Sequence, residues 1–348
     1  MRIGIIGCGN IATPYARDLV TYPDLTLAAL TDLDPARAAA LAENYGGQVY
    51  PDLTTMLAEA DLDLVVNLTF QRAHQEVTTT CLEAGKHVWS EKPLAMTYAG
   101  ARQLVELAGR KGLRLGCSPF TYLGAAQQTA SQWLREGRLG TVRAAYAEVN
   151  WGRIESWHPA PEAFYETGPL YDVGVYALTL LTAFLGPAQR VWAYGRILWP
   201  ERVTKDGRSF AVTAPDYVVL FVEFGQHLVA RVTANFYVTP STPQQGIEFH
   251  GDFGSLHLSS WLIPEATVSF GEFGQPLAPV PLVREPDKGL RWGTGIHEMA
   301  QAIRAGRPHR ATGLHAAHVV EIMEAAVQSI ASGAPVELNS TFPLPAPM

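Results

Sequence analysis

Three short segments of the sequence combine residue types and spacings that could do chemistry. A glycine-rich loop, Gly7-Cys8-Gly9-Asn10-Ile11-Ala12, is of the kind that brings backbone amides close to phosphate oxygens. An adjacent acid and base, Glu91-Lys92, stands directly before Pro93. Asp172 and Tyr176 lie four residues apart and could hold a hydroxyl group and move its proton. The segments therefore suggest a phosphate-bearing ligand, a fixed positive charge and a group for proton transfer.

The glycine-rich loop stands where a dinucleotide-binding loop is expected. It follows a short apolar strand, residues 2–6, and opens a helix that we expect to run to about Tyr22. Gly7 permits the tight turn, and Gly9 lets the backbone approach a pyrophosphate group. The small Ala12 lets the helix pack closely on the strand, and the helix N-terminus faces the anion. We therefore expect a strand, loop and helix that bind the pyrophosphate of a dinucleotide.

Asp32 completes this pattern and favours NAD over NADP. It ends a second strand, residues 25–31, about 20 residues past the glycines, where an acid binds the adenosine ribose 2′-hydroxyl. A carboxylate there repels a 2′-phosphate, and Leu33 follows where a phosphate-binding site would place arginine. Asp32 could instead cap the next helix, but Asp34-Pro35 already fills that role.

Glu91-Lys92 ends the strand that begins after Gly85. Ligands of open α/β sheets bind at the carboxyl ends of the strands, so the pair lies at the expected edge. Pro93 removes a backbone donor and restricts Lys92 to extended conformations, which stops the strand and holds the lysine as a fixed cation. An isolated Glu-Lys pair would fit a solvated strand end, but the loop upstream favours a ligand site.

Strands and helices alternate through residues 1–119, which predicts an α/β Rossmann domain with a doubly wound parallel sheet. We expect strands at residues 2–6, 25–31, 48–50 and 63–68, one ending at Glu91-Lys92, and one at 113–117. We expect helices from the glycine loop to about 22, at 35–45 and 52–59, ending at 84, and at 97–111.

The pattern changes in residues 120–348, where strands dominate, which predicts an α+β domain with a large open, mostly antiparallel or mixed sheet. We expect strands at 142–151, 191–197, 217–224, 228–237, 247–250, 255–258 and 267–270, with hairpin turns at 225–227 and 251–254. We expect helices at 124–137, 168–185, 294–305 and 313–332. Residues 152–167 are predicted to form a loop.

Composition excludes several classes of protein. The chain has 348 residues, 47% hydrophobic and 17% charged, and a net charge of −7, so it can bury large cores. No basic stripe stands out, which argues against nucleic acid and anionic membranes as partners. Three scattered cysteines predict a reducing, cytoplasmic location. No signal peptide and no membrane-spanning apolar run is recognised. His315, His318 and Glu321 lie on a predicted regular helix, where a solvated face is favoured over a metal site.

Several segments together resemble the Gfo/Idh/MocA family, which includes glucose-fructose oxidoreductase and the inositol dehydrogenases. The resemblance rests on the glycine loop, the stretch Ala84-Gly85-Lys86-His87-Val88, the triplet Glu91-Lys92-Pro93, residues 168–176 and 247–251, and the helices after Gly306-Arg307-Pro308. It implies a nicotinamide-dependent oxidoreductase that acts mostly on sugars and polyols. It also implies a cis Lys92-Pro93 bond and a homodimer or homotetramer formed through the open sheet.

The resemblance also suggests which groups move the proton. Many members have histidine at the position of Tyr176, whereas glucose-fructose oxidoreductase and the dihydrodiol and xylose dehydrogenases have tyrosine. We therefore interpret Tyr176 as the acid/base, Lys92 as its electrostatic partner and substrate-oxygen anchor, and Asp172 as the acceptor of a substrate hydroxyl. Asp172, Tyr176 and Thr179 would share one helix face. His158, in a loop beside Trp157, is the rival base, although it could simply bond nearby backbone.

The expected site therefore has three overlapping sets. The catalytic residues are Lys92, Tyr176 and Asp172. The cofactor-binding residues are Gly7, Gly9, Asn10, Ile11, Asp32, Asn67, Thr69, His74, Glu91 and Lys92. The substrate-binding residues are Lys92, Trp157, His158, Asp172 and Tyr176. Two alternatives remain open: an NAD-dependent glycosidase that transfers a hydride transiently, and an NAD-binding sensor without redox activity.

Overall fold

The chain is divided between two units in the computed structural model, which describes residues 1–225 and 227–348. The first unit consists of residues 1–120 and 291–320, and the second of residues 121–290 and 321–348. The sequence predicts a single boundary after residue 119, whereas residues 291–320 return to the first unit.

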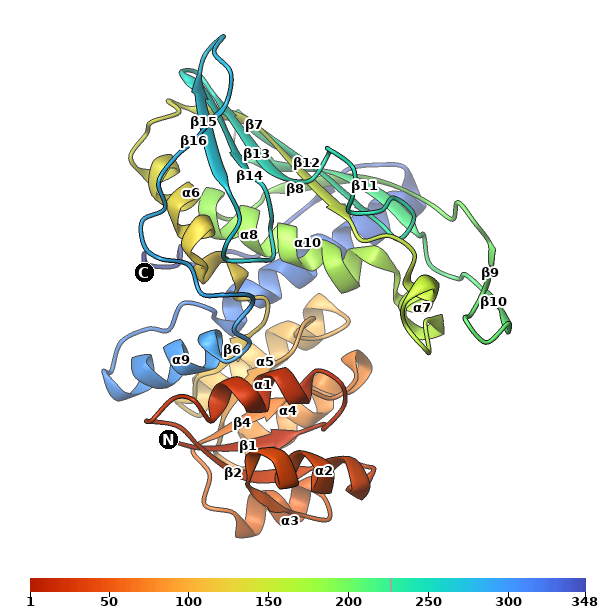
Figure 1. Cartoon of the computed structure of the whole chain (residues 1–348), viewed down its shortest axis with the longest axis vertical. Helices are drawn as coiled ribbons and strands as arrows, with labels where there is room; N and C mark the ends of the chain where they lie inside the picture. Colours follow the sequence, from red (N-terminus) through yellow and green to blue (C-terminus); the bar gives the residue numbers. More distant parts are fainter. Residues whose placement is uncertain (226) are drawn as a thin grey trace. The chain divides into compact units, whose positions relative to one another are not determined.

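A parallel sheet forms the centre of the first unit (Figure 1). Among the described residues it has six strands in the order β3-β2-β1-β4-β5-β6, and each neighbouring pair is parallel. The strands are β1 (Arg2–Ile6), β2 (Thr26–Thr31), β3 (Gln48–Val49), β4 (Leu64–Asn67), β5 (His87–Ser90) and β6 (Leu115–Cys117). This strand order confirms the predicted doubly wound sheet, and it places the ligand-binding switch point between β1 and β4.

Helices follow the strands as the sequence pattern predicts. They are α1 (Ala12–Leu19), α2 (Pro35–Tyr45), α3 (Leu53–Glu59), the 3₁₀ turn η1 (Gln71–Ala73), α4 (His74–Glu83) and α5 (Tyr98–Arg110). Asp34 caps α2 by accepting from the amide of Ala36, and Asp52 caps α3 by accepting from the amide of Thr55. Helix α1 ends at Leu19, three residues before the predicted end.

Residues 291–320 belong to the first unit because they pack on its sheet. Helix α9 (Thr294–Arg304) lies so close to β5 that a Cβ on Gly295 would lie 2.2 Å from the Trp89 ring. Trp292 packs its ring 5.5 Å from that of Tyr15, and Gly116 of β6 forms a β-bridge with Thr312. Hydrophobic periodicity predicts that α9 is a helix, but it does not specify the contacts that decide which sheet the helix covers.

The second unit is built on a larger sheet. In the part of the chain that is described, nine strands run in the order β16-β15-β14-β13-β7-β12-β11-β8-β17. They are β7 (Val142–Asn150), β8 (Arg190–Arg196), β11 (Tyr217–Phe224), β12 (Leu228–Asn235), β13 (Gly246–Gly251), β14 (Gly254–Leu258), β15 (Val268–Glu272), β16 (Ala278–Pro279) and β17 (Val336–Glu337). Strands β7 and β12 pair in parallel, and the other described pairs are antiparallel, which confirms the predicted mixed sheet. The predicted 251–254 turn joins β13 to β14, whereas Gln226 of the other predicted turn lies outside the described residues.

Helices cover one face of this sheet and leave the other open. The 3₁₀ turn η2 (Thr121–Leu123) leads into α6 (Ala125–Arg135), which packs on β14 and β15, and α8 (Val175–Leu185) packs on β7 (Figure 1). The covered face is apolar, with Phe184 of α8 6.1 Å from Phe249 of β13 between ring centroids. On the open face, large side chains such as Trp192 and Tyr194 are exposed. Helix α10 (Gly313–Ser332) begins among first-unit residues and ends among second-unit residues.

The segment before α8 differs from the regular helix that we predicted. Helix α7 (Glu162–Pro169) occupies part of the predicted loop, and Gly168 breaks the helix with a φ of +81°. A π-helical turn, η4 (Leu170–Gly174), then leads into α8. The stretch Glu162–Leu185 is long and apolar enough to cross a membrane by length and composition, but 89% of its most apolar window is buried inside the structure. That degree of burial is typical of a core helix.

Two short elements near residue 200 were not predicted. The strands β9 (Glu201–Val203) and β10 (Ser209–Ala211) form an antiparallel hairpin, which lies near α7 in Figure 1. The 3₁₀ turn η3 (Ile154–Ser156), which was also not predicted, interrupts the predicted loop between β7 and α7.

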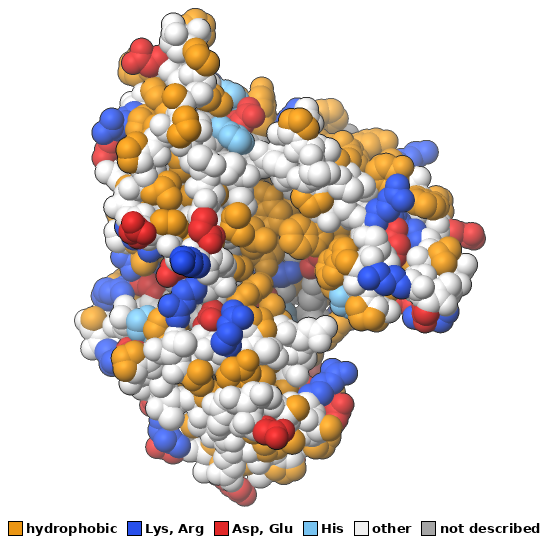
Figure 2. Space-filling view, in the orientation of Figure 1, with side chains coloured by type: hydrophobic (Ala, Val, Ile, Leu, Met, Phe, Trp, Pro, Cys, Tyr) orange, Lys and Arg blue, Asp and Glu red, His pale blue; other side chains and the backbone are white. Residues whose placement is uncertain are grey.

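On the face shown in Figure 2, basic and acidic side chains are mixed on each unit, and neither sign forms a separate patch.

Candidate active site

The glycine loop turns tightly at Gly7 and leaves open space beside Gly9. Gly7 has a φ of +89°, and a Cβ there would lie 2.7 Å from the carbonyl of Leu68, so a larger residue does not fit. A Cβ built on Gly9, in contrast, meets no described atom within 4 Å. The backbone at Gly9 is therefore open to a ligand, and α1 begins three residues later at Ala12.

Asp32 is fixed at the edge of this loop. One carboxylate oxygen accepts from the amide of Cys8 (2.6 Å) and the other from the amide of Asp34 (2.8 Å). Leu33 is fully exposed, and the cap of α2 is Asp34, as expected. Asp32 thus bridges the glycine loop and the end of β2, the position in which a carboxylate binds an adenosine ribose.

NAD is expected to bind more tightly than NADP, because the Asp32 carboxylate repels a 2′-phosphate. Asp32→Ala should reduce the ratio of NAD affinity to NADP affinity, as measured by fluorescence titration with each cofactor. Asp34→Ala is the matched control, since it removes a neighbouring carboxylate and the cap of α2 but should leave the preference unchanged. Equal or reversed affinities of the unaltered protein would overturn the role of Asp32.

Glu91 fixes the backbone of Lys92 from inside the unit. Its side chain is buried, and its two oxygens accept from the hydroxyl of Tyr15 and from the amide of Lys92 (3.0 Å). The Tyr15 hydroxyl also lies 2.9 Å from Ser118 Oγ. Burial and the neighbouring Glu91 raise the pKa of Tyr15, so the phenol stays protonated and can donate. Glu91, expected to bind cofactor, makes these contacts with protein groups.

His74 lies on the other side of the chain turn at Lys92-Pro93, which we call the corner. It is buried, with Nδ1 2.7 Å from the carbonyl oxygen of Pro93 and Nε2 3.0 Å from that of Thr69. Burial lowers the pKa of His74, against the raising effect of these carbonyl groups. The ring therefore connects the chain after β4 to the Lys92-Pro93 peptide, which is cis as expected.

Asn67 orders the chain where β4 ends. It is fully buried, its amide nitrogen donates to the His74 carbonyl and the Thr78 hydroxyl, and its oxygen accepts from the amide and hydroxyl of Thr69. Because the Leu68 carbonyl also lies against Gly7, the ends of β1 and β4 meet at the switch point of the sheet. The first unit thus brings the expected cofactor-binding residues to one edge.

Asp172 and Tyr176 lie at the start of the core helix of the second unit. Both are buried, Asp172 within the π-helical turn and Tyr176 in the first turn of α8. The wider π turn changes the phase between them, so the regular i, i+4 spacing that we expected does not apply. The Tyr176 ring lies 5.3 Å from the Trp261 ring, which lies 5.7 Å from Trp151. Neither tryptophan is among the predicted site residues, although Trp151 ends one predicted strand and Trp261 follows another.

Trp157 and His158 lie together in the loop after η3. Trp157 is 48% exposed, and the His158 ring packs 5.4 Å from it and 4.8 Å from Phe164. Nδ1 of His158 accepts from the amide of Ala160 (3.0 Å). The neutral ring must then carry its proton on Nε2, so the other nitrogen is a donor. This geometry matches the interpretation of a loop histidine that bonds nearby backbone.

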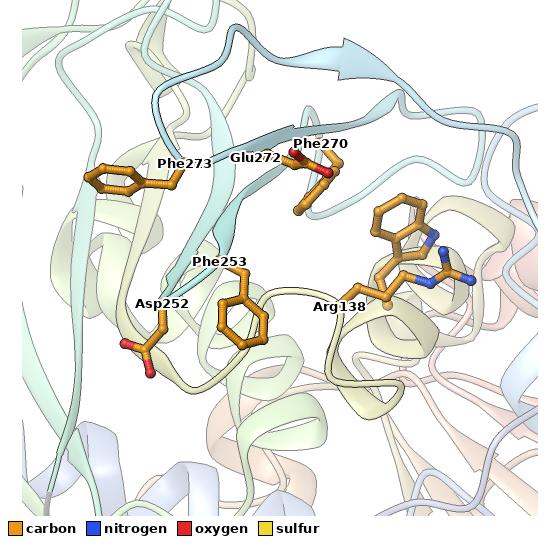
Figure 3. Close-up of a pocket in the computed structure, with 7 residues that line it drawn as sticks. Arg138, Asp252, Phe253, Phe270, Glu272 and Phe273 are labelled. Carbon is orange, nitrogen blue, oxygen red and sulfur yellow. The ribbon is translucent and has the colours of Figure 1, made fainter.

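A separate cavity of the second unit contains none of the expected site residues. It has a volume of about 760 Å³ and is lined by aromatic and charged side chains, namely Trp133, Arg138, Asp252, Phe253, Phe270, Glu272 and Phe273 (Figure 3). Asp252 is paired with Arg143, and Arg138 is paired with Glu136 and stacks on Trp133. Because Arg138 and Asp252 are already paired within the protein and the lining includes no expected site residue, we assign the cavity no part in the reaction.

His315, His318 and Glu321 are not on a solvated face, which corrects our expectation. All three are buried, and burial together with His318 lowers the pKa of His315 to about 3. Glu321 accepts from the amides of Asn339 and Ser340. Among the described residues, no group of three or more His, Cys, Asp or Glu side chains is arranged to hold a metal ion.

Comparisons with known proteins identify the family of the chain. Residues 1–118 match the family model "Oxidoreductase family, NAD-binding Rossmann fold", and residues 127–257 match the "GFO/IDH/MocA C-terminal domain". The dTDP-3,4-didehydro-2,6-dideoxy-alpha-D-glucose 3-reductase of Streptomyces antibioticus is 30% identical over 72% of this chain and 80% of its own. Inositol 2-dehydrogenase 2 of Saccharopolyspora erythraea is 27% identical over 100% of this chain and 99% of its own.

A solved structure has the same fold across both units. It is the WlbA dehydrogenase from Bordetella pertussis in complex with NADH and UDP-GlcNAcA, with a TM-score of 0.79 and 18% identity over 97% of this chain and 99% of that one. The chain belongs to the Gfo/Idh/MocA family of NAD-binding oxidoreductases.

Proposed function

We propose that the enzyme transfers a hydride between a CH–OH group of a sugar or polyol and NAD. The observation that carries the proposal is the edge of the first sheet, where an open glycine loop, Asp32 and a rigidly held Lys92 backbone converge. The relatives support the substrate class, since their names specify a dTDP-sugar and inositol, and a structural neighbour was solved with a nucleotide sugar.

In the proposed reaction, each of these residues has a separate role. Gly9 and Asp32 bind the dinucleotide, which when bound supplies the ring that exchanges the hydride. Lys92 holds the substrate oxygen and stabilises negative charge on it as the carbon–hydrogen bond breaks. Tyr176 takes the hydroxyl proton, so that the alcohol becomes a carbonyl, and Asp172 accepts a hydrogen bond from a further hydroxyl.

Tyr176 is the better candidate for the base than His158. A free tyrosine has a pKa of about 10, and a cation within hydrogen-bonding distance of the phenol, the role that we propose for Lys92, would favour the phenolate. His158 uses Nδ1 to accept from Ala160, so its neutral ring presents an N–H to any ligand. Such a group can orient a sugar oxygen, whereas Nε2 cannot accept a proton without first losing its own.

A substrate panel tests the proposal. The purified protein is incubated with NAD and a set of sugars and polyols, and the absorbance of NADH and the product mass are read in the same samples. NADH together with a product two hydrogens lighter supports the proposal. Sugar release without net NADH would replace it with the glycosidase mechanism, and no turnover with NAD bound would favour the sensor.

We further propose that the enzyme is a homodimer or homotetramer formed through the open face of the large sheet. Four aromatic side chains on that face are 38% to 59% exposed, namely Tyr146, Trp192, Tyr194 and Phe221. Trp192 and Phe221 stack with centroids 5.7 Å apart across β8 and β11. An apolar surface of this kind on a sheet is typical of a covered interface.

The double variant Trp192→Glu, Phe221→Glu is expected to be monomeric, because it places charges in the proposed interface. Light scattering after size exclusion measures the mass. Phe273→Glu is the control, since Phe273 is 85% exposed but lies beyond the end of β15. If the double variant keeps the mass of the unaltered protein, the interface lies elsewhere.

The three cysteines are free and buried, which supports our proposal that the enzyme works in the reducing cytoplasm.

A further inference from the structure

Arg202, on the β9–β10 hairpin, is a buried cation that joins two carboxylates. Its side chain is 0% exposed. Nη1 donates to Oε1 of Glu155 (2.8 Å), and Nη2 donates to Oδ2 of Asp216 (2.6 Å). The planar guanidinium suits this bridge, because its fork of donors can serve two acceptors in fixed directions.

The two carboxylates belong to different parts of the unit. Glu155 lies in η3, within residues 152–160, which we call the substrate loop. Asp216 directly precedes β11, and its other oxygen accepts from the amide of Leu198 (2.6 Å), before the hairpin. Arg202 therefore ties the substrate loop to the hairpin and to the start of a strand of the large sheet.

Tyr165 of α7 closes the same network. Its hydroxyl donates to Oε2 of Glu155 and accepts from the amide of Ile154 (3.3 Å), and its ring centroid lies 4.6 Å from the Arg202 guanidinium. Burial raises the pKa of Tyr165, and Glu155 adds to this effect, so the phenol remains a donor. Both oxygens of Glu155 are thus held inside the second unit.

This network fixes the segment that carries Trp157 and His158. The amide of His158 donates to the carbonyl of Ile154 (2.8 Å), so the turn held by Glu155 and Tyr165 continues directly into His158. A buried ion pair gives little net stability, but removal of one partner leaves an uncompensated charge in the interior. Loss of Arg202 would leave two carboxylates without their shared cation, and the loop would move to hydrate Glu155.

We propose that Arg202 is a positioning residue for substrate specificity: through Glu155 it holds the substrate loop so that Trp157 and His158 orient the sugar. The inference rests on the proposed function, in which these residues bind the substrate. Arg202 itself touches protein groups, and its effect on the sugar passes through the loop. The β9–β10 hairpin would then contribute to substrate specificity, although it was not among the expected site residues.

The test compares two arginines of the same hairpin. Arg202→Met removes the buried bridge, whereas Arg208→Met removes an exposed arginine that pairs with Asp206 and Glu162. Arg202→Met should raise the KM for the sugar about tenfold, the effect of losing one good hydrogen bond, with kcat and NAD affinity changed little. The KM of Arg202→Lys should lie between those of the unaltered enzyme and Arg202→Met, because an ammonium is a point charge without the forked donors of a guanidinium. Arg208→Met should match the unaltered enzyme, since exposed pairs contribute little.

A second measurement does not depend on turnover. Hydrogen–deuterium exchange of the peptide covering residues 152–160 should be faster in Arg202→Met than in Arg208→Met. Without Arg202, the Tyr165 hydroxyl that accepts from the amide of Ile154 is less ordered, so this amide is less protected. Faster exchange with a raised KM supports the proposal. Unchanged exchange, or faster exchange with an unchanged KM, overturns it. If the unaltered protein turns over no sugar, the proposed function fails, while exchange still reports whether Arg202 holds the loop.

Discussion

Lys92→Ala is expected to lower turnover by about 10²-fold or more while NAD affinity stays nearly unchanged. A preorganised cation beside the reacting oxygen acts on the transition state, and its loss appears in kcat. Two contacts that shape the corner involve the backbone, which the substitution keeps: Glu91 accepts from the amide of Lys92, and His74 contacts the carbonyl of Pro93. The variant should therefore fold and bind NAD, and single-turnover kinetics with an NAD titration separate the two effects.

Lys86→Ala is the matched control. Lys86 lies before the opposite end of β5, and its amine donates to the carbonyl of Leu62 (2.9 Å). Its removal takes away one lysine and one hydrogen bond from the same unit, so a small loss of stability with normal turnover is expected. A near-normal rate for Lys92→Ala would mean that the chemistry does not depend on this lysine.

Tyr176→Phe is expected to reduce the hydride-transfer rate about 10²-fold to 10⁴-fold, the usual contribution of a general acid or base. The substitution removes one hydroxyl and keeps the ring that packs against Trp261, so the Michaelis constant should change little. His158→Asn should instead raise the Michaelis constant, because we propose that the N–H of its ring orients a substrate oxygen. Single-turnover rates of both variants across pH discriminate between the two residues.

Tyr171→Phe serves as the control for a buried tyrosine on the same segment. Burial and Glu324 raise the pKa of Tyr171 to about 12, which makes it a poor base at neutral pH. Its variant should keep a normal rate. A normal rate for Tyr176→Phe together with loss of activity in His158→Asn would assign the base to His158.

The Rossmann unit could be predicted from sequence because its signals are local. Helix α2 begins at Pro35 with Asp34 as its cap, and β1 is an apolar run directly before Gly7, so neither needs knowledge of distant residues. The π-helical turn carrying Asp172 could not be predicted, because an inserted residue leaves the apolar pattern of a buried helix almost unchanged. The β9–β10 hairpin was missed because each strand has three residues, too few to set a period.

The candidate site divides in the same way. The positions of Gly9 and Asp32 follow from a spacing written in the sequence. The contacts of Glu91 with Tyr15, 76 residues away, and of His74 with Pro93 depend on which strand ends meet. The bridge from Arg202 to Glu155 is similarly non-local, and a lone arginine between short strands gives no signal of it. The sequence therefore predicts candidate ligand contacts, whereas the contacts that hold these residues in place depend on the fold.

Deuterium transfer tests the central claim most directly. The best substrate of the panel is prepared with deuterium on the carbon that is oxidised, and the reduced cofactor is isolated and weighed by mass spectrometry. Direct hydride transfer predicts NADH that carries one deuterium, in an amount equal to the carbonyl product. Carbonyl product accompanied by unlabelled NADH, or by no NADH, would contradict the claim that this chain moves a hydride from a CH–OH group to NAD.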